Sequence, residues 1–171
     1  SDADPSDADA DDGDADDGGG IDYEISEPGE PWAECTDNDL HDEAIVVTAH
    51  DRAHQFWTGW EEGQNARIVD VDAEFPEAPE EGSWRRVFMR VELDCPDSGR
   101  CDFWDRGATI SLVDEAGTDH EQPIELARHM TPYRVGMCFV ADVTEFAHRL
   151  VGTQTIRSFI DTWVGPGHVQ G

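Results

Sequence analysis

Lysine is absent from this 171-residue chain, and its 11 basic residues are all arginine. They stand against 40 acidic residues, which gives a formal net charge of −29 at pH 7. Proteins that bind nucleic acid need clustered lysine and arginine, because much of their affinity comes from counterions released around phosphates. The same shortage of positive charge disfavours attachment to anionic membrane surfaces. We therefore expect neither nucleic acid nor anionic lipid as a partner.

Long apolar runs are missing as well. No segment approaches the roughly 20 apolar residues that a membrane-spanning helix needs, so we expect no membrane insertion. The four cysteines lack the Cys-x-x-Cys spacing that is typical of metal sites. Cysteines of this kind favour disulfides and an oxidising compartment. The expected location is therefore secreted, periplasmic or at the cell surface.

The acidic residues are unevenly distributed along the chain. Residues 1–30 hold 13 of them and no basic residue. This tract is rich in Asp, Ala and Gly, and it offers almost nothing to bury. Its aspartate spacing is similar to that of a calcium-binding loop, but the glycine and the final glutamate of such a loop are missing. We predict a disordered acidic tether over residues 1–30 and one folded domain over residues 31–171.

The second part has the pattern of an all-β protein. From Arg85 to Asp94, apolar residues alternate with polar ones, which is typical of a half-buried strand. Further strands are expected around residues 45–49, 69–75, 108–112, 124–126, 137–143 and 155–164. The only helical turn is expected after Asp142, where Glu145 could complete a capping box. Short strands separated by turns predict an antiparallel β-sandwich, most simply a jelly roll.

The segment from Cys95 to Arg106 is the most distinctive part of the sequence. Cys95 and Cys101 lie six residues apart around a turn, and a disulfide between them would hold the following residues still. Those residues include Trp104, Asp105 and Arg106. Aromatic, acidic and basic side chains together are costly in a core, but they suit a loop that binds a polar ligand.

A second candidate site lies near the end of the last predicted strand. Alternation places Arg157, Phe159, Asp161 and Trp163 on one face of that strand. A carboxylate between two aromatic residues could serve as an acid/base group. The alternative is an aspartate on the solvent face of the strand, and the pattern alone does not separate the two.

Four motifs in order resemble the N-terminal jelly roll of the peptide-N-glycosidase F family. The family sequence C-D-x-W-D-R matches residues 101–106, and its T-P-Y matches residues 131–133. Its D-V-T-D-F resembles residues 142–146, and its T-E-T-W resembles residues 160–163. The resemblance extends over about 120 residues from Ile45 onward.

The resemblance implies an amidase that hydrolyses the bond between the innermost N-acetylglucosamine of an N-glycan and its asparagine. It places the catalytic carboxylate at Asp105, with Arg106 and Asp161 supporting it. Trp104 and Trp163 fall at the sugar site. It implies no metal and no cofactor, and the expected partner is an N-glycan or glycopeptide.

Two differences from the family pattern leave a second function open. Asp161 is one methylene shorter than the family's glutamate. The family also builds its site between two jelly rolls, whereas this sequence stops at Gly171, before the final strand of the first roll and the second domain. A non-catalytic module that binds carbohydrate or protein is therefore the alternative, and a second jelly-roll domain is a further expected partner.

Other residues carry weaker signals. His50 and His54 have a spacing that could join a metal site, but no third ligand is evident, and the paired ligands of copper monooxygenases are missing. Cys35 and Cys138 could form a second disulfide, with free thiols as the alternative. Three further tryptophans at positions 57, 60 and 84 are expected to pack in the core or at an edge rather than to extend a sugar-binding surface.

Overall fold

The computed structural model describes residues 35, 44–62, 64–79, 84–95 and 101–166. Within these ranges the chain forms strands and one short 3-10 helix, with no α-helix. The elements are β1 (Ile68–Phe75), β2 (Phe88–Leu93), β3 (Gly107–Asp114), β4 (Gln122–Met130), β5 (Met137–Asp142), η2 (Thr144–Phe146) and β6 (Gly152–Ile160). The predicted all-β class is confirmed. The predicted acidic tether, residues 1–30, lies outside the described residues.

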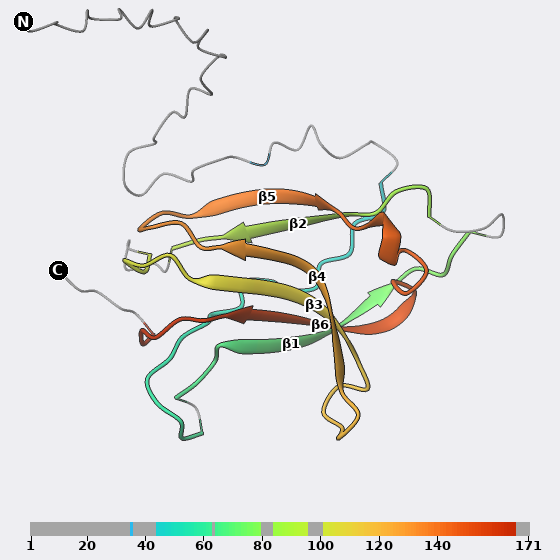
Figure 1. Cartoon of the computed structure of the whole chain (residues 1–171). Coiled ribbons are helices and arrows are strands. Elements are labelled where there is room, and N and C mark those ends of the chain that lie inside the picture. The colour runs from blue at the N-terminus through green and yellow to red at the C-terminus, as the bar shows by residue number, and fades with distance from the viewer. Residues whose placement is uncertain (1–34, 36–43, 63, 80–83, 96–100, 167–171) are drawn as a thin grey trace, which may run out of the picture.

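The strands form two antiparallel sheets (Figure 1). One sheet has the order β1-β6-β3-β4, and the other pairs β2 with β5. Side chains from both sheets meet in one core, because Met89 and Val91 of β2 pack against a cluster that includes Leu112 of β3 and Ile156 of β6. The chain is thus an antiparallel β-sandwich of jelly-roll type, as the alternating pattern predicted.

All three acidic side chains on β1 have a partner on β6. Because the two strands pair in antiparallel register, Asp70 lies opposite Arg157, Asp72 opposite Thr155 and Glu74 opposite Thr153. In each pair a side-chain hydrogen bond of 2.6–2.7 Å joins the two residues. Cross-strand pairing of this kind lets the sheet carry its negative charge without placing unpaired carboxylates side by side.

Two predicted elements differ from the structure. Residues 45–49 form no strand within the described part of the chain, although Val47 and Ala49 pack against the core. Alternation reports which side chains are buried, and an extended segment with no hydrogen-bonded neighbour produces the same alternation. The turn after Asp142 is the short helix η2, and its start differs from the predicted capping box because Asp142 accepts a hydrogen bond from the Thr144 backbone at 3.0 Å.

The last strand is shorter than predicted. β6 ends at Ile160, and the Thr162 backbone N–H then donates to the Ile160 carbonyl at 2.8 Å. This tight turn takes Asp161 and Trp163 off the strand, so the predicted common face of residues 157–163 is wrong beyond Ile160. Asp161 therefore lies at a bend rather than on a flat sheet surface.

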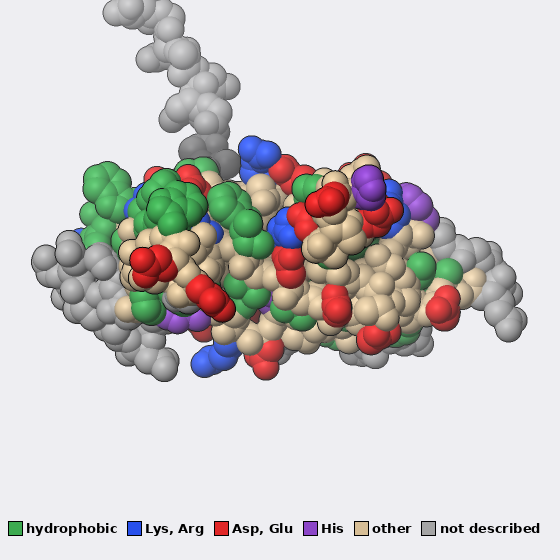
Figure 2. Space-filling view, turned by 90° about the horizontal axis from the view of Figure 1, so that it is seen from below, with side chains coloured by type: hydrophobic (Ala, Val, Ile, Leu, Met, Phe, Trp, Pro, Cys, Tyr) green, Lys and Arg blue, Asp and Glu red, His purple; other side chains and the backbone are tan. Residues whose placement is uncertain are grey.

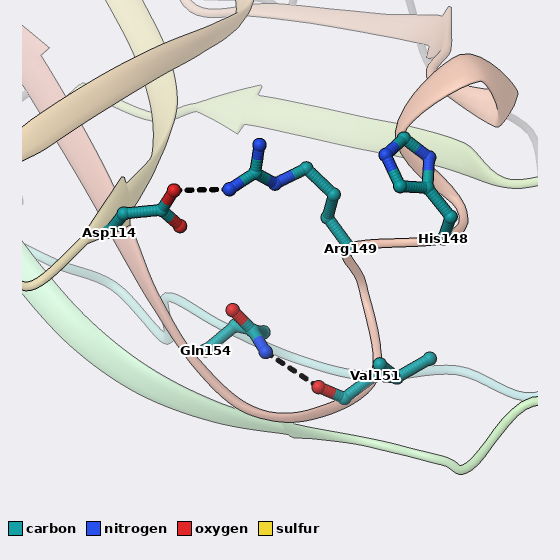
Figure 3. A pocket seen from close by; sticks show the side chains of 5 residues that line it. All are labelled: Asp114, His148, Arg149, Val151 and Gln154. Carbon is teal, nitrogen blue, oxygen red and sulfur yellow. Dashed lines mark hydrogen bonds and ion pairs between the residues drawn. The ribbon is translucent and has the colours of Figure 1, made fainter.

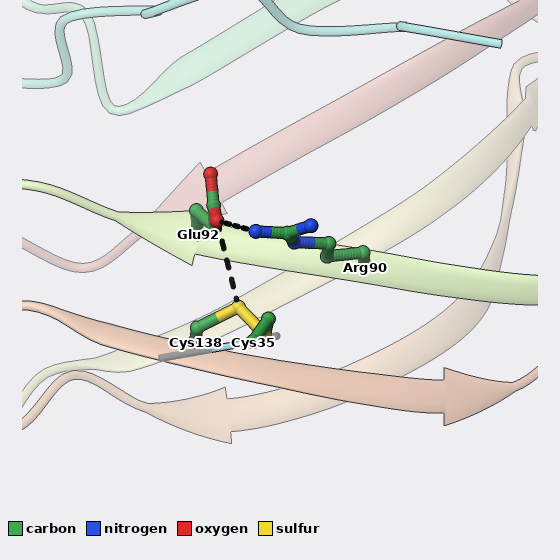
Figure 4. Close-up of a disulfide and its surroundings, with 4 residues drawn as sticks. All are labelled: Cys35, Arg90, Glu92 and Cys138. Carbon is green, nitrogen blue, oxygen red and sulfur yellow. Dashed lines mark hydrogen bonds and ion pairs between the residues drawn. A yellow bond between two sulfur atoms is a disulfide. The ribbon is translucent and has the colours of Figure 1, made fainter. Parts of the chain in front are cut away.

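Both predicted disulfides are present. Cys95 pairs with Cys101 across a Cα–Cα distance of 4.5 Å, and Cys35 pairs with Cys138 at 5.7 Å. The second bond fastens Cys35 to β5 beside Glu92 of the neighbouring strand (Figure 4). No cysteine is left free. Separately, no helix in the described ranges combines the length and the apolar character that crossing a bilayer requires.

Two partly buried histidines make the stability of the fold depend on pH. The ring of His129 on β4 lies 5.0 Å from that of Phe139, and neither of its nitrogens has a hydrogen-bond partner among the described residues. A ring nitrogen of His50 lies 3.2 Å from the carbonyl oxygen of Ile156. Burial lowers the pKa of both histidines below the usual value. The folded state therefore favours their neutral forms.

We expect acid to destabilise the fold through these histidines. A histidine in the unfolded chain has a pKa of about 6.5, so the unfolded state binds more protons, and the free energy of unfolding falls as pH drops below that value. His129→Leu should remove part of this fall and raise the stability at neutral pH by about 1 kcal/mol, because it eliminates two buried unpaired nitrogens. Urea unfolding between about pH 5 and 7.5 measures both effects.

The matched control for this experiment is His120→Leu, because His120 is exposed in the β3–β4 turn. It should leave both the stability and its pH dependence as in the wild type. If His129→Leu follows the wild-type pH profile instead, the buried ring is not a source of the acid sensitivity.

Candidate functional site

The predicted site residues meet at one end of the four-stranded sheet, where β6 and β4 finish and β1 and β3 begin. The backbone N–H of Asp161 donates to the Gly107 carbonyl at 2.9 Å, and that of Thr131 donates to the Arg106 carbonyl at 2.8 Å. The segment with Asp105 and Arg106 therefore lies beside the segment that follows β6. The fold brings together two stretches more than fifty residues apart in the sequence.

Arg106 is anchored on the inner side of this sheet end. Its Nε donates to Asp102 Oδ2 at 2.8 Å, and both side chains are largely buried, with 17% and 16% of their surface exposed. The Thr162 hydroxyl lies 3.4 Å from the same carboxylate oxygen. The Arg106 backbone N–H donates to Thr131 Oγ1 at 2.9 Å. Arg106 therefore fixes the backbone that carries Asp105.

Asp105 and Trp104 are exposed, in contrast to Arg106. Trp104 is 64% exposed, and Asp105 is exposed as well. Within the described ranges, no group forms a hydrogen bond or an ion pair with the Asp105 carboxylate. The site thus presents a carboxylate that is open to an incoming ligand on a backbone held by buried contacts.

Asp161 has a different environment. Its carboxylate lies 3.3 Å from the Arg67 guanidinium, and its side chain is 49% exposed, so water reaches the Asp161 carboxylate. Asp161 stands opposite Gly107, and Asp105 lies two residues further along, roughly 7 Å for an extended chain. The two carboxylates share one end of the sheet without contacting each other.

Arg67 is the residue that sequence analysis missed. Its side chain is only 10% exposed, and its Nε donates to the Thr162 carbonyl at 2.6 Å. The guanidinium carbon lies 3.6 Å from the ring centroid of Trp163 and 4.4 Å from that of Trp57. One feature of the sequence could have indicated its burial: Arg67 has the same alternation as residues 69, 71 and 73 of β1, which are less exposed than the residues between them. Arg67 thus joins three separate segments of the site.

Aromatic side chains are concentrated at this end of the molecule. Figure 2 shows hydrophobic side chains gathered on the left, where β6 finishes in Figure 1, while acidic groups are spread over the whole of this face. Large exposed aromatic residues of this region are Trp60, Trp104, Tyr133 and Trp163. Exposed rings beside carboxylates are typical of surfaces that bind polar organic ligands.

The loop that carries Asp105 has two kinds of anchor. The Cys95–Cys101 disulfide closes its first part. Beyond it, the Arg134 backbone N–H donates to the Asp102 carbonyl at 3.0 Å, and the Arg134 guanidinium lies 4.1 Å from the Phe103 ring centroid. These contacts tie the loop to the segment after β4.

Replacing Cys95 and Cys101 with serine should loosen this loop more than it lowers global stability. A ring this small contributes about 2 kcal/mol through the entropy of the unfolded chain. Amide exchange at residues 101–106 should accelerate by about tenfold or more, since the loop then opens locally. The matched control, the double serine variant at Cys35 and Cys138, should leave exchange in the loop unchanged. Unchanged exchange after loss of Cys95–Cys101 would show that the other contacts hold the loop alone.

A shallow depression lies at the opposite end of the sheet (Figure 3). It is lined by Asp114, His148, Arg149, Val151 and Gln154. Arg149 forms an ion pair with Asp114, and Gln154 Nε2 donates to the Val151 carbonyl at 2.6 Å. Its polar groups are thus engaged with one another, and it contains none of the predicted site residues.

The described residues contain no group of three or more His, Cys, Asp or Glu side chains arranged to hold a metal ion. His50 and His54 do not converge on one point, since His50 contacts the Ile156 carbonyl and His54 lies against Phe56, with ring centroids 5.3 Å apart. Among the other tryptophans, Trp60 is 78% exposed, so of the two expected positions, core or edge, it does not occupy the core.

Comparison with solved structures identifies proteins of the same fold. One is the structure of PNGase F, a glycosylasparaginase from Flavobacterium meningosepticum, with a TM-score of 0.54 and 22% sequence identity. The match covers 70% of this chain and 37% of that protein. A second structure, of the peptide-N(4)-(N-acetyl-β-D-glucosaminyl) asparagine amidase, matches over the same shares with a TM-score of 0.56. PNGF-II matches with a TM-score of 0.54 and 14% identity, over 70% of this chain and 31% of its own.

These matches show a PNGase F-like fold. The chain spans little more than a third of the length of the PNGase F structures that it matches. No protein-family model matches the chain, and neither does any curated protein sequence.

Proposed function

We propose that this chain, which has a PNGase F-like fold, is the glycan-facing part of an exported amidase. Its substrate is an N-glycoprotein or glycopeptide, and the bond that it cleaves joins the innermost N-acetylglucosamine to asparagine. The two disulfides support an extracellular location. In this proposal, a second domain completes the catalytic site.

The observation that carries the proposal is the state of the Asp105 carboxylate. It is exposed and has no partner among the described residues, while its neighbour Arg106 is fixed by Asp102 and Thr131. An exposed acidic side chain on a backbone held by its neighbours, next to exposed Trp104, is available for acid/base chemistry on a sugar-linked group. The same position is the catalytic carboxylate that the sequence resemblance implies.

The reaction can be assigned to these groups. Asp105 accepts a proton from water as the water oxygen attacks the carbonyl carbon of the asparagine side chain. The carbon–nitrogen bond then breaks, and the nitrogen leaves with the sugar as a glycosylamine after taking up the proton. The other product is aspartate. All atoms come from the glycopeptide and one water molecule.

The remaining predicted residues take supporting roles. Arg106 positions Asp105 through the backbone, since its guanidinium is engaged with Asp102. Asp161, steadied by Arg67, is placed to hydrogen-bond sugar hydroxyl or amide groups rather than to transfer the proton. Trp104 and Trp163 are 64% and 52% exposed, and their rings are available to stack on sugar faces.

One observation favours a second candidate, a glycan-binding module without catalysis. The exposed tryptophans need no help from the carboxylates to bind sugar, and Asp161 is already paired with Arg67. Such a module would bind an N-glycopeptide and leave it intact. Binding without release by the full-length gene product would therefore favour the module.

The test is glycan release from a denatured N-glycoprotein by the full-length gene product. The proposal predicts a released glycosylamine and conversion of the glycosylated asparagine to aspartate, both detected by mass spectrometry. Absence of release under conditions where the protein is folded would overturn the amidase proposal.

A further inference from the structure

The loop of residues 57–65, which precedes β1, is held in place by backbone hydrogen bonds. Trp57 and Asn65 form an antiparallel bridge, and the Thr58 backbone N–H donates to the Gln64 carbonyl at 2.6 Å. The Trp57 backbone N–H donates to the Val164 carbonyl, also at 2.6 Å, which fastens the loop to the segment after β6. The two segments approach so closely that a Cβ on Gly165 would meet the Thr58 methyl group at 2.6 Å. The loop therefore has a defined position beside Trp163.

Three indole rings and one cation form a continuous cluster at this loop. The Trp60 and Trp57 rings lie 4.2 Å apart edge to face, and the Trp57 and Trp163 rings lie 5.4 Å apart. The buried Arg67 guanidinium contacts both Trp57 and Trp163, and it also donates to the Thr162 carbonyl. Such contacts fix ring orientation, so Trp60 is held on a rigid base.

Trp60 is nevertheless 78% exposed, the highest fraction among the large hydrophobic residues described. Its neighbours in sequence carry no apolar side chain, with Thr58 and Gly59 before it and Glu61 and Glu62 after it. Gln64 Nε2 donates to Glu61 Oε2 at 3.1 Å, so an amide and a carboxylate are held together in the same loop as Trp60. A large indole that is supported on one side, largely exposed on the other and carried by a loop with hydrogen-bonding side chains is suited to a ligand with one apolar face and a polar rim.

We propose that Trp60 is a second sugar-stacking platform, which holds a pyranose unit further along the same oligosaccharide as the unit at Trp163. The inference rests on the proposed function, because it takes Trp163 as the site of an inner sugar. Trp60 is two ring contacts away from Trp163, a separation that neighbouring units of one oligosaccharide can bridge. The platform would make the domain prefer extended glycans over a single N-acetylglucosamine.

A sugar fits this surface better than a protein partner. The core of a protein interface is depleted of charged residues, whereas Glu61 and Glu62 follow Trp60 directly. The excess of acidic residues in the chain disfavours an anionic ligand, and the pyranose units of the N-glycan core carry no charge. The hydroxyl groups of a pyranose can pair with the amide of Gln64 and the carboxylates of Glu61 and Glu62 while its apolar face covers the indole.

The test is titration of the 171-residue chain with two probes, free N-acetylglucosamine and the free core pentasaccharide of N-glycans, followed by NMR. Trp60→Ala should weaken binding of the pentasaccharide by about tenfold, a typical loss when one stacking ring is removed. It should leave binding of the monosaccharide unchanged. Trp60→Phe, which keeps an aromatic face, should stay within about threefold of the wild type. Phe88→Ala, an exposed aromatic on β2, is the matched control and should have no effect.

The inference is overturned if Trp60→Ala binds the pentasaccharide like the wild type, if it weakens both probes equally, or if the wild-type chain does not bind the pentasaccharide. It is also overturned if Trp60→Ala weakens binding to a glycoprotein and to its enzymatically deglycosylated form alike, because that result indicates a protein partner. Failure of the proposed function looks different. Glycan release would then be absent while Trp60-dependent binding of the pentasaccharide persists.

Discussion

Replacing Asp105 with asparagine should lower the rate constant for glycan release by about a thousandfold or more. A positioned acid/base group contributes typically 10²- to 10⁴-fold, and asparagine cannot exchange the proton that the reaction requires. The free energy of unfolding should stay within about 0.5 kcal/mol of the wild-type value, because the Asp105 carboxylate is exposed and has no partner among the described residues. The measurement is release kinetics together with urea unfolding.

The matched control is Asp119→Asn. Asp119 is also an exposed aspartate, and it lies in the β3–β4 turn at the opposite end of the sheet. This variant should release glycan at the wild-type rate. Equal rates for Asp105→Asn and the wild type would contradict the role of Asp105, even if the protein proved to be an amidase.

Replacing Arg67 with methionine should lower the free energy of unfolding by about 3 kcal/mol. The variant loses a charged hydrogen bond to the Thr162 carbonyl, contacts with two indole rings and the ion pair with Asp161. Asp161 is half exposed, so its carboxylate can return to water, and the ion pair accounts for a small part of the loss. Urea unfolding gives the stability, and exchange at the Trp163 indole N–H reports whether its ring becomes mobile.

Arg128→Met is the control for this substitution. Arg128 forms an ion pair with Glu125 on β4, but its side chain is 73% exposed. Exposed pairs contribute about 0–1 kcal/mol, so this variant should remain close to the wild type. A similar small effect of Arg67→Met would mean that the stack of Arg67 with the tryptophans does not support the site.

The regular strands could be predicted from the sequence because their burial alternates. Val69, Val71 and Ala73 of β1 and Ile110 and Leu112 of β3 lie in strands where the pattern placed them. The same pattern failed at residues 45–49, since side-chain alternation carries no information on whether a neighbouring strand supplies hydrogen bonds. Pairing depends on residues far apart in the sequence.

The location of the site could be predicted in part. The resemblance of residues 101–106 and 160–163 to one family pointed to two segments that the fold places side by side. The environment of Asp161 could not be predicted, because it depends on the bend after Ile160 and on an arginine almost a hundred residues earlier. Arg67 itself was overlooked since a single charged residue before an apolar strand resembles a solvent-exposed strand end.

The excess of acid in the composition has no direct part in the proposed chemistry. The acidic residues of β1 are paired with residues of β6, including Arg157. Arg157 also forms an ion pair and a hydrogen bond with Glu121, before β4, and these lower the pKa of the Glu121 carboxyl below its usual value. Asp142 is similarly stabilised as an anion, because hydrogen bonds from Thr144 lower its pKa. The carboxylate of interest is instead one that the described structure leaves without a partner.

The most direct test of the proposed function is to follow the water oxygen into the carboxyl group that forms when the carbon–nitrogen bond is cleaved. The full-length gene product is incubated with a defined N-glycopeptide in water labelled with oxygen-18, and the masses of both products are measured by mass spectrometry. The account predicts a glycosylamine and a peptide in which asparagine has become aspartate carrying one heavy oxygen atom. A peptide that still carries asparagine or asparagine-linked N-acetylglucosamine would contradict it.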